Sequence, residues 1–141
     1  MPLTALGVVF TGGVLGGLAR YAVTSAWPAP AYRFPWATFV VNTAGTFALA
    51  LLLLILTEVW SPHRYARQLL GTGFLGAFTT FSAVVLTVAQ LTAHDHLWTA
   101  VIYLTASLLA AAGAGSVGLL LGVAVIASRH RAQEPPPRRR R

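Results

Sequence analysis

Residues 71–82 read GTGFLGAFTTFS, a glycine-rich stretch followed by a cluster of hydroxyl-bearing residues. They lie inside an apolar segment from about Arg67 to Thr92 that is long enough to cross a bilayer. Glycines and hydroxyls in this density disfavour an unbroken helix, and a break frees backbone carbonyls that lipid cannot hydrate. The stretch therefore predicts a membrane segment that is broken at mid-membrane, between about Gly73 and Ser82.

Three further apolar segments accompany this one. Of the 141 residues, 56% are hydrophobic and 9% are charged, against roughly one quarter charged in a soluble domain. One bilayer crossing needs roughly 20 apolar residues, so the chain accommodates four. We predict an all-α membrane protein with four transmembrane helices. The other three run from about Leu3 to Ala26, from about Trp36 to Trp60 and from about Leu97 to Ala127.

The first segment is rich in glycine, which lets membrane helices approach each other closely. We therefore expect it to pack centrally. It has no basic region in front of it, so we expect no signal peptide. The chain contains no cysteine, which excludes disulfides and thiolate metal sites.

The net charge of +7 arises mainly at the C-terminus, where six of the ten arginines follow Ser128. We therefore divide the chain into a membrane domain, residues 1–128, and a disordered basic tail, residues 129–141. The tail has no aromatic residue to stack on bases, so we expect contact with anionic lipid headgroups and no nucleic acid.

The arginines also predict an orientation, because the chain has no lysine. Arg64, Arg67 and the tail lie on the side that holds both termini, whereas Arg33 lies on the other. The positive-inside rule then places both termini in the cytoplasm, if Arg20 lies within the first helix.

Polar side chains within the apolar segments are the candidate functional residues. An arginine at the bilayer centre costs at least about 2.5 to 3.5 kcal/mol, so Arg20 either marks a helix end or attracts ions. Asn42 must face protein or a pore, because lipid satisfies none of its hydrogen bonds. Thr38 lies four residues before Asn42, and Tyr103 lies four residues before Ser107. Each pair shares a helical face, which predicts two short polar tracks.

Two features of the third segment suggest ion chemistry. Carbonyls freed at the break and converging from two copies of the chain offer ligands to a cation, unless hydroxyls satisfy them in a simple kink. Phe81 follows the break. An aromatic ring has a positive edge, which can face a small anion in a pore, although most membrane phenylalanines pack or face lipid.

Three blocks of the sequence, in this order and spacing, resemble the Fluc or CrcB family of fluoride channels. They are GG-x-x-GG-x-x-RY at residues 12–21, W-x-T-x-x-x-N-x-x-G-x-F at 36–47 and GF-x-G-x-x-TTFS at 73–82. The resemblance implies a fluoride-selective channel in the cell membrane, through which fluoride leaves the cytoplasm passively. It also implies an antiparallel dimer with two pores and a structural sodium ion (Na+) at its centre. This dimer is either a homodimer or, as the one-sided distribution of arginines predicts, a pair with an oppositely oriented paralogous subunit.

The resemblance assigns a role to each matching position. The carbonyls of Gly76 and Thr79 would bind the sodium ion, Phe81 and Asn42 would line the fluoride pore, Thr38, Tyr103 and Ser107 would form a hydroxyl track, and Arg20 would lie near the vestibule.

Three positions depart from the family pattern. The second pore phenylalanine of the family falls at Val84, a frequent carboxylate falls at Thr87, and a further serine falls at Ala111. Val84 and Thr87 keep open the alternative of a non-conducting partner subunit. A second alternative is a coupled transporter, which normally needs a buried ionisable residue, and the second to fourth segments have none at mid-depth.

An enzyme is not expected, because the acidic residues are scattered and provide no pair of carboxylates for acid-base work. They are Glu58, Asp95 and Glu134. The histidines, at positions 63, 94, 96 and 130, are interpreted as solvated loop residues.

Overall fold

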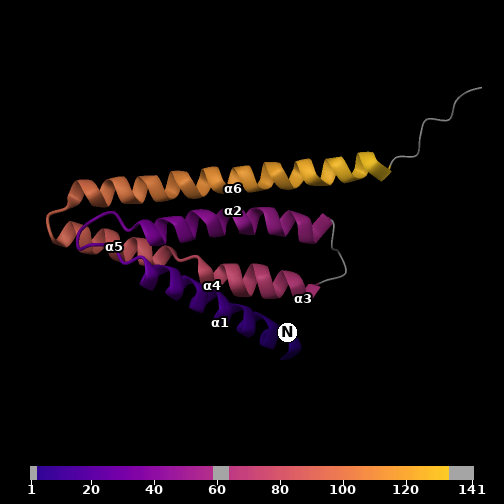
Figure 1. Ribbon diagram of the computed structural model, residues 1–141, viewed down its shortest axis with the longest axis horizontal. Coiled ribbons are helices and arrows are strands. Elements are labelled where there is room, and N and C mark those ends of the chain that lie inside the picture. The colour runs from indigo at the N-terminus through magenta and orange to yellow at the C-terminus, as the bar shows by residue number, and fades with distance from the viewer. Residues whose placement is uncertain (1–2, 59–63, 134–141) are drawn as a thin grey trace, which may run out of the picture.

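A computed structural model describes residues 3–58 and 64–133, and all regular structure in these ranges is helical (Figure 1). The helices are α1 (Leu3–Ala26), α2 (Trp36–Glu58), α3 (Arg64–Ala66), η1 (Arg67–Leu75, a π-helix), α4 (Gly76–Phe78), α5 (Phe81–Ala93) and α6 (Leu97–Gln133). Four stretches are long and apolar enough to cross a membrane: Leu3–Ala26, Trp36–Leu56, Arg67–Ala93 and Leu97–Arg129. The prediction of four spanning segments is confirmed.

One helix end differs from its predicted boundary, and the predicted end of another lies outside the described residues. α2 is described to Glu58, so the end predicted near Trp60 falls outside the described part. α6 continues to Gln133, past the boundary predicted after Ser128. Arginine, alanine and glutamine favour helix there, and no glycine or proline follows Ser128 before Pro135. The first residues assigned to the tail are therefore helical, and residues 134–141 lie outside the described part.

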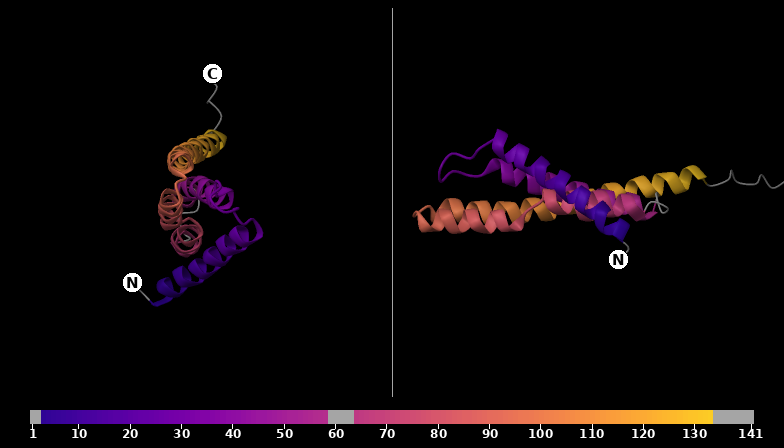
Figure 2. Two further views of the ribbon diagram at one scale, coloured as in Figure 1. Left: turned by 90° about the vertical axis from the view of Figure 1, so that its left-hand side faces the viewer. Right: turned by 90° about the horizontal axis from the view of Figure 1, so that it is seen from below.

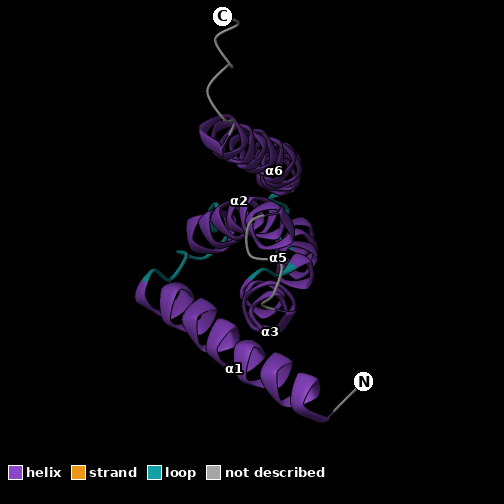
Figure 3. Cartoon of the chain, turned by 90° about the vertical axis from the view of Figure 1, so that its right-hand side faces the viewer, coloured by secondary structure: helices purple, strands orange, loops and turns teal. Residues whose placement is uncertain are grey.

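The spans are arranged with α1 and α6 on opposite sides. α6 packs on α2 and α5, whereas α1 packs on η1 and α4 (Figure 3). α1 crosses the other helices obliquely (Figure 2). Both ends of the described chain lie at the end of the bundle where α2 leads toward α3 (Figure 1). The loop after α1 and the turn before α6 lie at the other end, as the predicted orientation requires.

Glycines bring α1 and η1 into backbone contact. A Cβ atom on Gly12 would clash with the carbonyl oxygen of Leu69, and one on Gly16 would clash with that of Phe74. A Cβ on Gly73 would lie 2.7 Å from the carbonyl oxygen of Val9. The close packing expected of the first segment is confirmed. Its central position is not found within one chain, because the opposite face of α1 is exposed.

Large apolar side chains cover the outside of the bundle. Leu3 is 86% exposed, Trp98 79% and Phe10 71%. Water would penalise this distribution, whereas lipid does not, because its tails are as apolar as the side chains.

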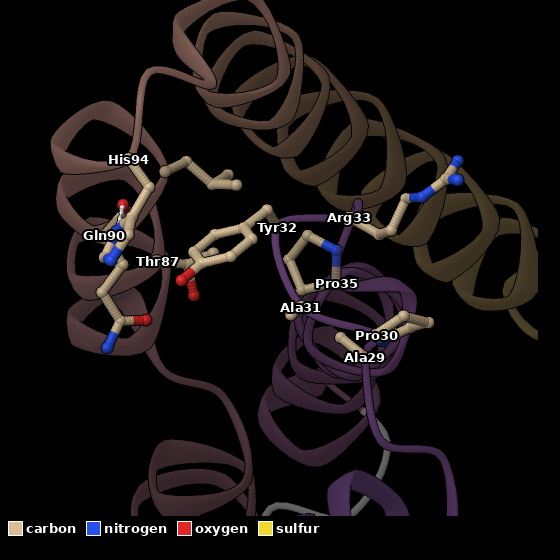
Figure 4. Close-up of a pocket in the computed structure, with 10 residues that line it drawn as sticks. Ala29, Pro30, Ala31, Tyr32, Arg33, Pro35, Thr87, Gln90 and His94 are labelled. Atoms are coloured by element: carbon tan, nitrogen blue, oxygen red, sulfur yellow. Dashed lines mark hydrogen bonds between the residues drawn. The ribbon is translucent and has the colours of Figure 1, made fainter.

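An aromatic stack ties the two loops together at the end remote from the termini. The centroid of the Tyr32 ring lies 4.6 Å from the centroid of the His94 ring and 5.1 Å from that of the His96 ring. Both histidines are exposed, as interpreted from the sequence. A cavity of about 370 Å³ lies beside the stack, with Thr87 of α5 and the following His94 on one wall and Tyr32 opposite (Figure 4).

Candidate functional site: a polar cavity at a helix break

The third span is interrupted at two residues. α4 ends at Phe78 and α5 begins at Phe81, with Thr79 (φ −81°, ψ 152°) and Thr80 (φ −152°, ψ 115°) extended between them. The Thr80 hydroxyl oxygen caps α5 by accepting a hydrogen bond from the Ala83 backbone N–H at 3.2 Å. The interruption lies within the predicted window, residues 73–82, but is narrower, because the glycines before it remain helical in the wider π geometry of η1.

Asn42 of α2 binds the interruption with both ends of its amide. Its Nδ2 donates to the Thr80 carbonyl oxygen at 2.9 Å, and its Oδ1 accepts from the Thr80 backbone N–H at 2.7 Å. A single side chain thus satisfies both polar groups of an extended residue between two helices. The amide has a second N–H on Nδ2, which none of the hydrogen bonds of the described residues uses.

Arg20 of α1 and Thr79 satisfy two more carbonyls at the interruption. Arg20 Nε donates to the Ala77 carbonyl oxygen at 3.2 Å. The backbone N–H and the hydroxyl of Thr79 both donate to the Leu75 carbonyl oxygen, at 3.1 and 3.0 Å. Arg20 therefore lies well inside α1 and bonds to the end of α4, which rules out its interpretation as a helix-end residue.

Three carbonyl oxygens at the interruption, those of Gly76, Phe78 and Thr79, receive no hydrogen bond from the described residues. Gly76 is exposed and Thr79 is half-buried on the surface of the single chain. Lipid cannot supply the missing donors. The carbonyls of Gly76 and Thr79 are those assigned to a cation from the sequence, and their chemistry, two oxygen acceptors without donors, fits a hard cation.

A cavity of about 200 Å³ opens beside the interruption. Of the predicted pore residues, it brings together Asn42 of α2, Phe81 of α5 and Ser107 of α6, whereas Thr38 and Tyr103 do not line it. The Phe81 side chain is 65% exposed, so its ring lies at the surface of the chain beside the cavity. The remaining lining residues are Thr46, Thr79, Thr80, Val84, Leu108 and Ala111.

The hydroxyl track of α6 is buried. Tyr103 is fully buried, Ser107 is 9% exposed, and apart from each other their hydroxyl groups have no hydrogen-bond partner among the described residues. The Phe34 ring packs edge-to-face with the Tyr103 ring, 5.2 Å away between centroids. Thr38 is half-buried one turn before Asn42. A mutual hydrogen bond would use only one of the two hydroxyl protons, and burial of the other without an acceptor is costly.

The three departures from the family pattern fall in two places. Val84 and Ala111 line the 200 Å³ cavity and make part of its wall apolar. Thr87 lines the separate cavity near the loops. Thr46 also lines the 200 Å³ cavity and was missed from the sequence, although it continues the spacing of Thr38 and Asn42 by one more turn of α2.

Four apolar spans, three of which line a cavity with amide and hydroxyl groups, define a multi-pass membrane protein. Residues 7–119 of the chain match the sequence model of the family described as "CrcB-like protein, Camphor Resistance (CrcB)". The chain belongs to this family, and it is a multi-pass protein of the cell membrane.

Individual relatives carry more specific names. The chain is 44% identical over 126 residues to "Fluoride-specific ion channel FluC 3" of Streptomyces avermitilis, covering 89% of this chain and 62% of that protein. It is 43% identical over 111 residues to "Fluoride-specific ion channel FluC 2" of Nocardia farcinica, covering 79% of this chain and 76% of that protein. The chain thus spans less than two thirds of the Streptomyces avermitilis relative. A second protein of that organism, named FluC 2, is 44% identical over 101 residues.

Proposed function

We propose that this chain is a subunit of a fluoride-selective channel that lets fluoride leave the cytoplasm passively. The observation that carries the proposal is the cavity at the helix break, where amide and hydroxyl groups line an apolar span without a single carboxylate. The names of the relatives supply the identity of the ion.

The lining chemistry favours a small, strongly hydrated anion. An ion that enters a narrow pore must exchange its water for groups of the protein. The second N–H of Asn42 and the hydroxyl of Ser107 can donate to an anion, and the ring edge of Phe81 is weakly positive. The Asn42 oxygen is not available to a cation, because it already accepts a hydrogen bond from the Thr80 backbone N–H.

The free carbonyls of Gly76 and Thr79 support a structural sodium ion. They would supply two oxygen ligands, and binding to the ion would hold the interruption at a fixed geometry. A sodium ion needs more than two ligands, so a second subunit that presents the same pair would complete the shell. Antiparallel pairing brings two such sites together at the same depth, which supports a dimer around this point.

The partner subunit is either a second copy or a paralogue. Two similar proteins numbered FluC 2 and FluC 3 in one organism support pairing between paralogues.

Arg20 bonds to the end of α4 and would bring positive charge close to the ion path without entering the cavity.

Reconstitution tests the proposal directly. The purified chain, alone or with a paralogous subunit from the same cells, is placed in liposomes loaded with potassium fluoride. Valinomycin then starts efflux, and a fluoride electrode follows it. We expect rapid efflux that needs no proton gradient, and no efflux from liposomes loaded with chloride. Efflux that requires a proton gradient would indicate a coupled transporter, and folded protein without fluoride efflux in either arrangement would refute the channel.

A further inference from the structure

Thr46 is a polar residue of the cavity to which neither the sequence motifs nor the family names assign a role. It lies on α2 one turn after Asn42, is half-buried, and lines the 200 Å³ cavity together with Asn42 and Ser107. We infer that the Thr46 hydroxyl is a specificity-determining donor to the permeating anion. This inference rests on the proposed function and adds a residue to it.

The contacts of Thr46 separate its methyl group from its hydroxyl. A Cβ atom added at Gly115 of α6 would lie 3.4 Å from the Thr46 Cγ2, so the methyl group is directed toward α6, where Gly115 leaves room for it. Because threonine is branched at Cβ, the direction of the methyl group also sets the direction of the hydroxyl. Gly115 thus allows α6 to approach Thr46 without filling the space beside it.

The Thr46 hydroxyl also remains available for a ligand. Hydroxyls in membrane helices commonly donate to a carbonyl of their own helix, and those of Thr11, Thr24 and Thr92 do so four residues back. The described residues provide no such bond for Thr46. A half-buried hydroxyl on a cavity wall with an unused proton is suited to meet an ion.

The opposite wall of the cavity explains why this donor matters. Ala111 of α6 lines the cavity one turn after Ser107 and offers no polar group. Asn42 and Thr46 share a face of α2, so Thr46 extends the row of donors by one turn where α6 does not. An anion that moves along the cavity then exchanges the N–H of Asn42 for the O–H of Thr46. Without Thr46 it would pass from Asn42 into an apolar stretch.

Two substitutions at Thr46 and one nearby test the inference in the liposome efflux assay. Thr46→Val removes the hydroxyl and keeps a methyl group directed toward Gly115, whereas Thr46→Ser keeps the hydroxyl and removes the methyl group. Thr43→Val makes the same chemical change on the same helix at a half-buried position that does not line the cavity. We expect Thr46→Val to lower fluoride flux by about tenfold or more, the factor for loss of one hydrogen bond to a charged group.

The controls separate a pore role from a structural one. Thr46→Ser should retain flux within about twofold of the unsubstituted chain, and Thr43→Val should behave like that chain. The assembly measured by gel filtration should be the same in all three variants. Unchanged flux in Thr46→Val, or an equal loss in Thr46→Ser, would overturn the inference while leaving the channel intact. Absence of fluoride flux from the folded, unsubstituted protein would instead overturn the proposed function, and this inference with it.

Discussion

Asn42→Ala removes the side chain that holds the helix interruption. It breaks the bonds from Nδ2 to the Thr80 carbonyl at 2.9 Å and from the Thr80 N–H to Oδ1 at 2.7 Å. A hydrogen bond between membrane helices contributes about 0.6 kcal/mol on average and up to about 1.7 kcal/mol. Losing both bonds therefore costs about 1 to 3 kcal/mol of unfolding free energy. The cost lies toward the upper end, because no lipid group replaces the partners of Thr80.

Reversible unfolding in mixed micelles, titrated with sodium dodecyl sulfate, measures this free energy. Thr43→Ala, at the next position of α2, is the matched control, since Thr43 makes no side-chain hydrogen bond within the described residues. We expect Asn42→Ala to reduce fluoride flux strongly while the proposed dimer persists, because the helices still pack through their other contacts. An unfolding free energy equal to that of Thr43→Ala would refute the assignment of Asn42 as a clamp on Thr80.

Three further predictions concern packing, the pore and orientation. Gly16→Ala should destabilise the chain by roughly 1 to 3 kcal/mol in the same titration, because the new Cβ meets the Phe74 carbonyl, whereas Gly17→Ala, with open space around it, should be neutral; equal effects would contradict the backbone contact. Phe81→Ile should reduce fluoride efflux strongly with the dimer intact, and Ser107→Ala should be milder, since water can replace one hydroxyl; normal efflux from Phe81→Ile would reject Phe81 as a pore residue. A reporter at the C-terminus should signal from the cytoplasmic side alone, because the arginines favour one orientation, and equal signal from both sides would contradict the charge argument.

The spans and the interruption were predictable because both depend on local composition. Apolar length determines which segments cross the bilayer, and adjacent hydroxyls and glycines mark where a helix can stop. The extent of the interruption was not predictable. Gly71 and Gly73 are buried against neighbouring helices, and this packing keeps their backbone helical where the sequence alone suggested a break.

The candidate site was predictable as a set of residue types and not as a set of contacts. The sequence left open whether Asn42 joins helices or lines a pore. In the structure its amide binds Thr80 of the third span, and the same side chain lines the cavity. Arg20 was expected to mark a helix end or attract ions, and its partner, Ala77, lies on a segment far away in sequence. Spacing along one helix cannot reveal such partners, because they depend on how helices pack.

The hydrogen bonds around the interruption also argue for what surrounds it. Side chains of the same chain donate to the carbonyls of Leu75, Ala77 and Thr80, while those of Gly76, Phe78 and Thr79 receive no donor within the described residues. Gly76, whose carbonyl oxygen has no donor, is exposed at the surface of the span and not buried within it. Lipid at that face would leave the oxygen unsolvated at a cost of several kcal/mol. The Phe81 ring beside the interruption is also 65% exposed, so an exposed backbone and an exposed aromatic side chain both occur at this break. A second subunit that brings its own interruption to this surface would cover both, and this is the physical reason to place the proposed dimer contact here rather than along α6.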